Sequence, residues 1–366
     1  MVRRDPFFLK PPGKPILISR CGFTLVELLI LIGIAIVLLG MLLPSTRRVS
    51  EAARRITCAN NLRQIGLATH NYESANRELP MAIGAQDQDG QFLPKRISGL
   101  VTLLPFIESS PLYDQISTPT EFNGIEYPAF GPEFSDETYP PWTQTLPYFV
   151  CPSDSFEEAT FGRTNYAFSI GDTARRVYQP TKLRGVFGAF RSSTLYDISD
   201  GTSNTISMSE MGSPQIKSIR GGFLTEGKSN WLDAPGQVFS AVGKKRSEYK
   251  PSAELGCRGS HWADGSAGIS LINTILPPGS PSFQVSNNQD GDGVYSAGSG
   301  HSGGINVALA DCSTHFVSNE IDAGDPTTAT LTVQQIESET VIASPHGVWG
   351  AMGTMAGGET EAKDHF

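Results

Sequence analysis

A serine in a glycine-rich frame is the first feature with catalytic character. Residues 300–304 read GHSGG and match G-x-S-x-G, with Ser302 where α/β-hydrolases carry their nucleophile. That geometry needs a strand before the serine and a helix after it. Here a Gly- and Asp-rich stretch precedes Ser302, and a strand-like stretch, 305–310, follows it. We therefore interpret the pattern as a glycine turn that leads into a hairpin. An anchored serine hydrolase stays a remote alternative, and we expect no enzymatic activity.

A second stretch has the character of a metal-binding loop. Residues 288–293 read NQDGDG, so the oxygen-bearing side chains of Asn288, Asp290 and Asp292 alternate as in the opening of a calcium loop. The glutamate that closes such a loop is missing, because Ser299 occupies its position. We interpret the stretch as a solvated turn, with calcium binding as the alternative. No other cofactor or metal is expected.

The cysteines and the net charge exclude two further classes of function. None of the five cysteines is spaced as CxxC, so the sequence does not support a zinc ribbon or a thioredoxin-like redox site. The net charge is −9 although the first 22 residues are basic, so the rest of the chain is strongly acidic. An acidic surface repels phosphates, and we expect no nucleic acid partner.

The elements that must position these residues begin with an apolar segment, 23–43, in which Thr24 and Glu27 are the polar residues. As a helix its 21 residues would extend about 31 Å, enough to cross the hydrocarbon core of a bilayer. A secretory signal has a shorter apolar region and ends in an A-x-A-like site, which is missing at 42–45. We therefore predict a transmembrane helix that is retained as an anchor.

The residues around the start of this segment resemble the prepilin processing motif. The stretch 20–27 reads RCGFTLVE, and a carboxylate inside a membrane helix needs a partner. The resemblance implies that a prepilin peptidase cleaves after Gly22 and N-methylates Phe23. It also implies that Glu27 pairs with the positive N-terminus of a neighbouring subunit during assembly, and that Pro44 kinks the helix.

Beyond the anchor we predict an α+β fold, in which a long pilin-like N-terminal helix packs on a β-rich C-terminal globular domain. The expected parts are a cleavable leader at 1–22, the transmembrane helix at 23–43, an amphipathic continuation at 44–78 and an extracytoplasmic domain at 79–366. The continuation has apolar residues at helical spacing, and the domain has short apolar runs between Gly, Pro, Asn and Asp clusters. The apolar positions of the continuation are Val49, Ala52, Ile56, Ala59 and Leu62. The predicted strands are 100–107, 148–151, 185–190, 205–208, 237–242 and 305–310.

Several stretches of the body resemble a prepilin-type family, domain of unknown function 1559, whose C-terminal signature is H-X9-DG. Nine residues separate His301 from Asp311, as the signature asks, but Cys312 replaces the glycine. We assign His301 and Asp311 a structural role, as a hydrogen-bonded pair across the hairpin. The family has no established activity, so the resemblance implies architecture and export route. The other matching stretches are 58–67, 70–72, 149–154, 200–205, 258–259, 262–265 and 347–350.

The replacement at Cys312 has a physical consequence. Stretches 305–310 and 313–318 predict two strands joined at Asp311, and an Asp-Gly pair suits a turn with positive φ. A cysteine in the left-handed region costs about 1 kcal/mol, so either the turn differs or a partner such as a disulfide holds Cys312.

The pairing of the cysteines stays open. If Cys21 leaves with the leader, four cysteines remain and can pair in three ways in an oxidising compartment. We favour disulfides over buried thiols. The four are Cys58, Cys151, Cys257 and Cys312.

The expected function is that of a pilin- or pseudopilin-like structural subunit, exported through the prepilin peptidase pathway and assembled in a type II secretion or type IV pilus system. Its expected partners are the prepilin peptidase, like or other pilin-type subunits and the membrane. We expect a single-pass protein of the bacterial inner membrane with its globular domain outside the cytoplasm, or at the cell surface after assembly. The alternative from another class is a membrane-tethered extracytoplasmic ligand-binding protein or adhesin.

Overall fold

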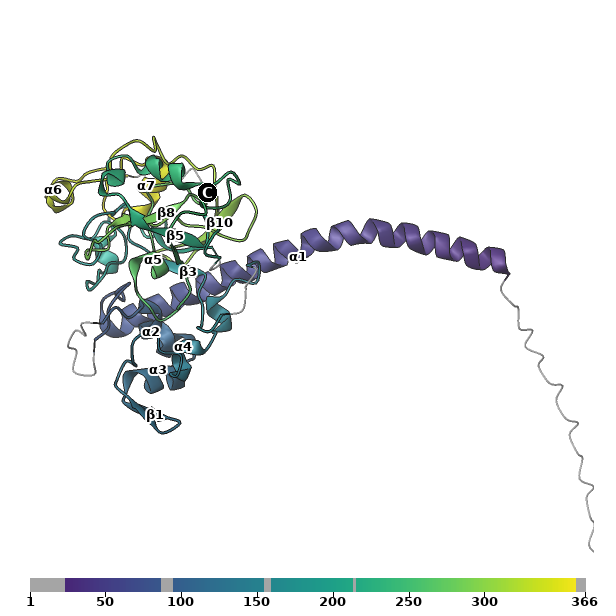
Figure 1. The fold of residues 1–366 in the computed structure, drawn as a ribbon, viewed down its shortest axis with the longest axis horizontal. Helices are drawn as coiled ribbons and strands as arrows, with labels where there is room; N and C mark the ends of the chain where they lie inside the picture. The colour runs from purple at the N-terminus through teal and green to yellow at the C-terminus, as the bar shows by residue number, and fades with distance from the viewer. Residues whose placement is uncertain (1–23, 87–94, 155–158, 213–214, 360–366) are drawn as a thin grey trace, which may run out of the picture. The chain divides into compact units, whose positions relative to one another are not determined.

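The computed structural model describes residues 24–86, 95–154, 159–212 and 215–359, and the side chains of 38–50 lie outside the description. The chain divides into two units, Met1–Ser50 and Glu51–Phe366, which we describe one at a time. Gly22 and Phe23 lie outside the described residues. Figure 1 follows the elements along the chain.

The first unit contains the N-terminal part of α1, a helix that extends over Leu25–Asn76 and continues through Pro44. Its large apolar side chains from Leu25 to Val37 are between 45% and 74% exposed. The Glu27 carboxylate accepts hydrogen bonds from the backbone N and from Oγ1 of Thr24, both at 2.9 Å, which ties it to the start of the helix. Within the described residues, no helix combines the length and the apolar character that a membrane crossing requires.

The second unit begins with the rest of α1, which packs one face into the globular core. Cys58, Leu62, Ile65 and Ala68 are all buried at three- and four-residue spacing, the pattern of an amphipathic helix. The predicted face is therefore rotated, because Ile56 is 62% exposed although it belongs to the predicted apolar pattern. The helix carries two adjacent apolar stripes, and the spacing of apolar residues in the sequence did not show which of them is buried.

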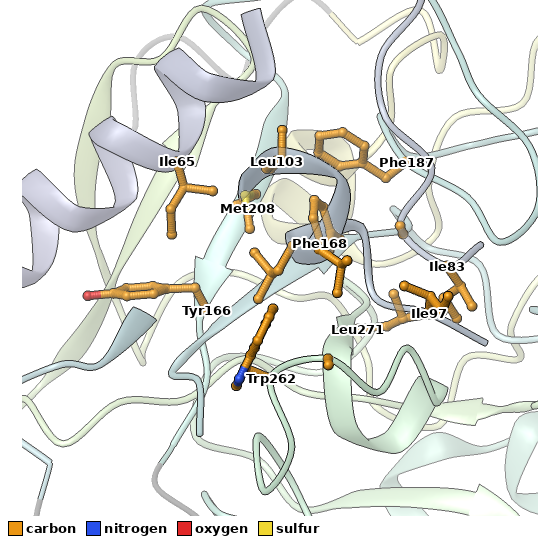
Figure 2. Packing of buried hydrophobic residues seen from close by; sticks show 14 of the residues in the cluster. Ile65, Ile83, Ile97, Leu103, Tyr166, Phe168, Phe187, Met208, Trp262 and Leu271 are labelled. Carbon is orange, nitrogen blue, oxygen red and sulfur yellow. The ribbon is translucent and has the colours of Figure 1, made fainter. Parts of the chain in front are cut away.

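A five-stranded sheet forms the centre of this unit, in the order β11-β10-β4-β3-β7, and its pairs are antiparallel except β3 with β7. Every residue of β3, β4 and β10 is buried, because both faces of the sheet are covered. One face contributes Tyr166, Phe168 and Met208 to a core shared with Ile65 of α1 (Figure 2). The opposite face packs on Trp349. The strands are β3 (Tyr166–Ser169), β4 (Ile206–Glu210), β7 (Leu271–Ile272), β10 (Gly304–Leu309) and β11 (Thr314–Ser318).

A four-stranded sheet, in the order β6-β5-β8-β9, packs around a separate core that contains Trp231 and Phe283. The α+β prediction with a β-rich globular domain is therefore confirmed. The strands of this sheet are β5 (Gly222–Gly227), β6 (Leu255–Cys257), β8 (Ser282–Val285) and β9 (Gly293–Val294), and a further hairpin consists of β1 (Thr120–Phe122) and β2 (Ile125–Tyr127).

Short helices lie between the strands and replace some predicted strands. The run 100–107 is helical, because Ser98 caps the helix by accepting from the Leu100 N–H and Pro105 suits the start of the following turn. Residues 148–149 and 237–241 of two further predicted strands lie in 3₁₀ turns that begin at a proline. The helices are α2 (Gly99–Leu103), η1 (Leu104–Ile107), α3 (Ser110–Ser117), α4 (Pro140–Thr143), η2 (Pro147–Phe149), η3 (Leu195–Asp197), η4 (Ser229–Leu232), η5 (Pro235–Ala241), α5 (Ala267–Ser270), α6 (Val333–Glu337) and α7 (Gly347–Gly353).

Candidate functional site

Four side chains from distant parts of the sequence meet in the interior of the globular unit. Cys58 comes from α1, Cys151 follows η2, Glu210 ends β4 and His301 precedes β10. Cys58 and Cys151 form a disulfide across 93 residues of sequence. The sulfur, imidazole and carboxylate atoms of the four residues lie within 4.8 Å of one another. Among the described residues this is the group whose His, Cys, Asp and Glu atoms are close enough to share a metal ion.

His301 is the centre of the group. Its Nδ1 lies 2.8 Å from Oε1 of Glu51, and its Nε2 lies 3.3 Å from Oε1 of Glu210 and 3.6 Å from Sγ of Cys151. An ionised carboxylate only accepts hydrogen bonds, so carboxylates at both nitrogens favour the doubly protonated ring. Burial lowers the pKa of His301, but hydrogen bonds and charges from Glu210 and Glu51 outweigh it, so the pKa is raised.

Glu210 is a buried carboxylate whose oxygens are held by the neighbouring strand. The backbone N of Asn306 donates to Oε2 and its Nδ2 donates to Oε1, each at 2.8 Å. Asn306 is on β10, which pairs with β4, so the sheet register places the two residues together. These bonds and His301 offset the cost of burying the charge.

Glu51 faces the site from the first turns of α1 in this unit and is partly exposed. The hydroxyl of Ser153 donates to its Oε1 at 3.0 Å. Burial raises the pKa of Glu51, but the hydrogen bonds from His301 and Ser153 outweigh burial, so the pKa is lowered. Cys151 is itself positioned through its backbone N, which donates to Oδ1 of Asn165 at 2.8 Å.

A polar pocket of about 220 Å³ adjoins this group. Ser153, which contacts Glu51, and Ser299 and Gly300, which precede His301, contribute to its wall. Arg220 lies on the same wall and donates from Nη1 to the carbonyl oxygen of Ser299 at 3.1 Å. The site is therefore buried but lies close to solvent on one side.

The predicted pair of His301 and Asp311 is not formed. Asp311 is exposed, and its Oδ1 accepts from the backbone N of Ser313 at 2.9 Å and from its hydroxyl at 2.6 Å. The six residues of β10 separate the two positions, which corresponds to about 20 Å along an extended strand. His301 is paired with two glutamates, and Asp311 shapes the turn.

Cys312 adopts the left-handed conformation, with φ of 68°, so the turn keeps the positive φ expected for the glycine position. Its side chain is a buried thiol, so no second disulfide forms from it. Burial, with the charge of Asp311, raises the pKa of this thiol to about 11. A Cβ built at Gly66 would lie 3.4 Å from the Cβ of Cys312, so α1 passes close to the turn. Cys257 is half-buried in β6.

The stretch 288–293, interpreted as a turn with calcium binding as the alternative, has its polar side chains bonded to nearby backbone groups. Oδ1 of Asn288 accepts from the backbone N of Asp290, and the Asp292 carboxylate accepts from the backbone N of Arg176. Burial raises the pKa of Asp292. Among the described residues, three acidic or histidine ligands do not converge in this loop.

The nucleophile elbow is also not formed. Ser302 is exposed, and the strand β10 follows it at Gly304 where the elbow would require a helix. This segment is a glycine turn that leads into the hairpin of β10 and β11.

Glu51, Glu210 and Asn306 were missed by sequence reasoning. One signal was available, because Glu51 and Cys58 are seven residues apart and therefore share a face of α1. Glu210 ends β4, in which every residue is buried, and its carboxylate bonds to residues of other segments. Its contact with Asn306 depends on the order of strands in the sheet, which the local pattern does not specify.

The comparisons with known proteins assign a family to the chain. The family described as "Protein of unknown function (DUF1559)" matches residues 47–324, which include every residue of the His301 site. Neither the curated proteins nor the solved structures include a significant match to the chain. Since the match extends over more than half of its 366 residues, the chain belongs to the DUF1559 family.

Proposed function

We propose that this protein is a pilin- or pseudopilin-like subunit, processed by a prepilin peptidase and anchored in the bacterial inner membrane by the first part of α1. The observation that carries the proposal is the apolar surface of α1 between Leu25 and Val37. Its large side chains are between 45% and 74% exposed, and a helix that is apolar all round needs a lipid or protein environment. The processing motif at Gly22 and Phe23 immediately precedes this helix.

The disulfide supports a location of the globular unit outside the cytoplasm. Cys58 and Cys151 are both buried in the bridge. Disulfides persist in oxidising compartments and are rare in the reducing cytosol, so the bond fits export of the unit that carries it.

Glu27 supports assembly rather than simple tethering. Its carboxylate lies in the first turn of α1, where the free amino group of a processed neighbour would be its natural partner. A charge among apolar side chains is expensive unless it is paired, so the two charges favour association of subunits.

The first test is the mature N-terminus. Mass spectrometry of the membrane-extracted protein is expected to give a chain that begins with N-methylated Phe23. A chain that retains residues 1–22 contradicts processing by a prepilin peptidase. A chain that begins at any other residue also contradicts this processing.

The second test is Glu27→Ala. We expect membrane insertion to continue and cross-linked assemblies to fall at least about tenfold. The substitution leaves the amino group of the neighbouring subunit without its carboxylate, and an unpaired buried charge costs more than about 1.4 kcal/mol. The matched control is Glu126→Ala, which removes an exposed glutamate of β2 and leaves assembly unchanged. Equal assembly of wild type and Glu27→Ala contradicts the subunit role.

A tethered ligand-binding protein or adhesin is the second candidate. The polar pocket beside Ser153 and Arg220 favours it, since such a pocket can receive a small polar ligand. Correct processing at Gly22 combined with unchanged assembly in Glu27→Ala would support this alternative over the subunit.

A further inference from the structure

The arrangement of Cys58, Cys151, Glu210 and His301 is also the arrangement of a zinc site. We propose that, when the disulfide is reduced, the two thiolates join Oε1 of Glu210 and Nε2 of His301 to bind one Zn²⁺. The disulfide and the zinc complex are then two alternative states of one buried site. The proposal is independent of whether the protein assembles into a filament.

The distances between the ligand atoms fit tetrahedral coordination. Zinc bonds of about 2.0–2.2 Å to nitrogen and oxygen and about 2.3 Å to sulfur imply edges of about 3.3–3.6 Å between unlike ligand atoms. Nε2 of His301 lies 3.3 Å from Oε1 of Glu210 and 3.6 Å from Sγ of Cys151. Sγ of Cys151 lies 4.0 Å from the same Oε1. Three edges of the tetrahedron are therefore close to their final lengths.

The fourth ligand requires one local movement. In a tetrahedral site the two sulfurs stand about 3.8 Å apart, so the bonded sulfurs must separate after reduction. Cys58 is fixed on α1, whereas Cys151 follows the short turn η2 in a segment without regular structure. We expect Cys151 to make most of this movement.

The surroundings of the ligands match those of metal-binding side chains. A histidine that binds zinc through one nitrogen commonly donates from the other to a carboxylate, and Nδ1 of His301 lies 2.8 Å from Glu51. A metal-binding carboxylate is itself held by donors, and Asn306 donates to both oxygens of Glu210. A buried disulfide needs neither of these partners. The charged groups around the two cysteines are therefore the partners that a zinc-bound, reduced site needs, and the disulfide does not need them.

The chemistry balances with a thiol or phosphine reductant. The reductant transfers two electrons to the Cys58–Cys151 bond, and two protons complete the two thiols. Zinc then displaces both thiol protons and the Nε2 proton of His301 to solvent. In the reverse direction a disulfide oxidant takes two electrons from the thiolates, the S–S bond forms again and Zn²⁺ leaves. The pocket beside Ser153 and Gly300 offers the ion a path to solvent.

The experiment uses the full-length protein in mild detergent, with Co²⁺ as a spectroscopic substitute for Zn²⁺. Reduced wild type is expected to bind one equivalent of Co²⁺, with the thiolate charge-transfer band and the visible bands of tetrahedral cobalt, and one equivalent of Zn²⁺ should displace it. The oxidised wild type should bind at least about 100-fold more weakly, because it lacks both thiolates. This comparison needs no substitution.

Variants separate the site from the rest of the chain. Cys151→Ser removes one of the two thiolates and should weaken both cobalt binding and the charge-transfer band, whereas Cys312→Ser, which removes a buried thiol outside the site, should leave both unchanged. Glu51→Gln should retain the spectrum and weaken binding about 10- to 100-fold, as loss of an outer partner does. Circular dichroism checks that each variant is folded.

The outcomes that overturn the proposal are specific. Equal cobalt binding by reduced and oxidised wild type contradicts it, and so does loss of the band in Cys312→Ser but not in Cys151→Ser. If reduction unfolds the globular unit, added Zn²⁺ must restore the folded dichroism spectrum. Failure to restore it also contradicts the proposal.

Discussion

The two ends of β10 contact the same helix, α1, through different chemistry. At the start of the strand, His301 and Cys151 meet Glu51 and Cys58, and the contact consists of charge and sulfur. At its end, Nε2 of His70 lies 2.7 Å from the carbonyl oxygen of Ala310, and Cys312 lies against Gly66.

The difference shows that His301 and Asp311 do not form one site. His301 belongs to a buried polar group that can change its protonation, redox state or ligands. Asp311 is exposed and shapes a turn through Ser313. In this chain the buried strand β10 is attached to α1 at both ends, and the charged and sulfur-containing side chains are concentrated at the first end.

The largest expected effect is the loss of the disulfide at the first end. Reduction in the presence of a chelator is expected to lower the free energy of unfolding by about 4–5 kcal/mol, because the bridge closes a loop across 93 residues. Urea denaturation of oxidised and reduced protein, followed by tryptophan fluorescence, measures the difference. The chelator keeps divalent ions from replacing the bridge.

The control for reduction is Cys312→Ser, which should show the same loss on reduction because its thiol is not bridged. Coincident denaturation curves for oxidised and reduced wild type would show that the bridge does not stabilise the fold.

The next prediction compares the loss of stability when a carboxylate is removed at each end of β10. Glu210→Ala is expected to cost about 3 kcal/mol, since it leaves buried donors of His301 and Asn306 without an acceptor. Asp311→Ala removes two hydrogen bonds at an exposed turn and should cost about 1 kcal/mol. Denaturation midpoints of oxidised protein give both values. A larger cost for Asp311→Ala would reverse the comparison.

Much of the second end could be predicted from the sequence. The apolar run at 305–310, the stretch 313–318 and the Asp at 311 between them indicated a hairpin, and the structure has β10 and β11 there. The strain at Cys312 followed from its replacement of a glycine. These features are local, so a few neighbouring residues determine them.

The first end could not be predicted in the same way. Glu51 and His301 are 250 residues apart, and their contact depends on which face of α1 is buried and on the order of the strands. The predicted helix face was wrong at Ile56, which hid the shared face of Glu51 and Cys58. The predicted contact between His301 and Asp311 was wrong, and the predicted strand already argued against it. A six-residue extended strand holds the residues at its two ends about 20 Å apart.

An effect smaller than that of Glu210→Ala is a pH dependence confined to the second end. The folded pKa of the Cys312 thiol is about 11, above its ordinary value of about 9, because burial and Asp311 disfavour the thiolate. The folded state therefore holds this proton more tightly, so the contribution is complete below pH 9 and is lost as the pH rises toward 11. By pH 10 the loss is about 1.4 kcal/mol.

The measurement is the difference in unfolding free energy between wild type and Cys312→Ser from pH 8 to pH 10.5, which cancels the tyrosines common to both. The wild type is expected to lose stability relative to the variant across this interval. The disulfide at the other end does not titrate, so oxidised protein isolates the thiol of Cys312. A difference that stays constant with pH would mean that Cys312 is no less ionisable than a solvent-exposed thiol. The buried environment assigned to the Cys312 thiol would then be wrong.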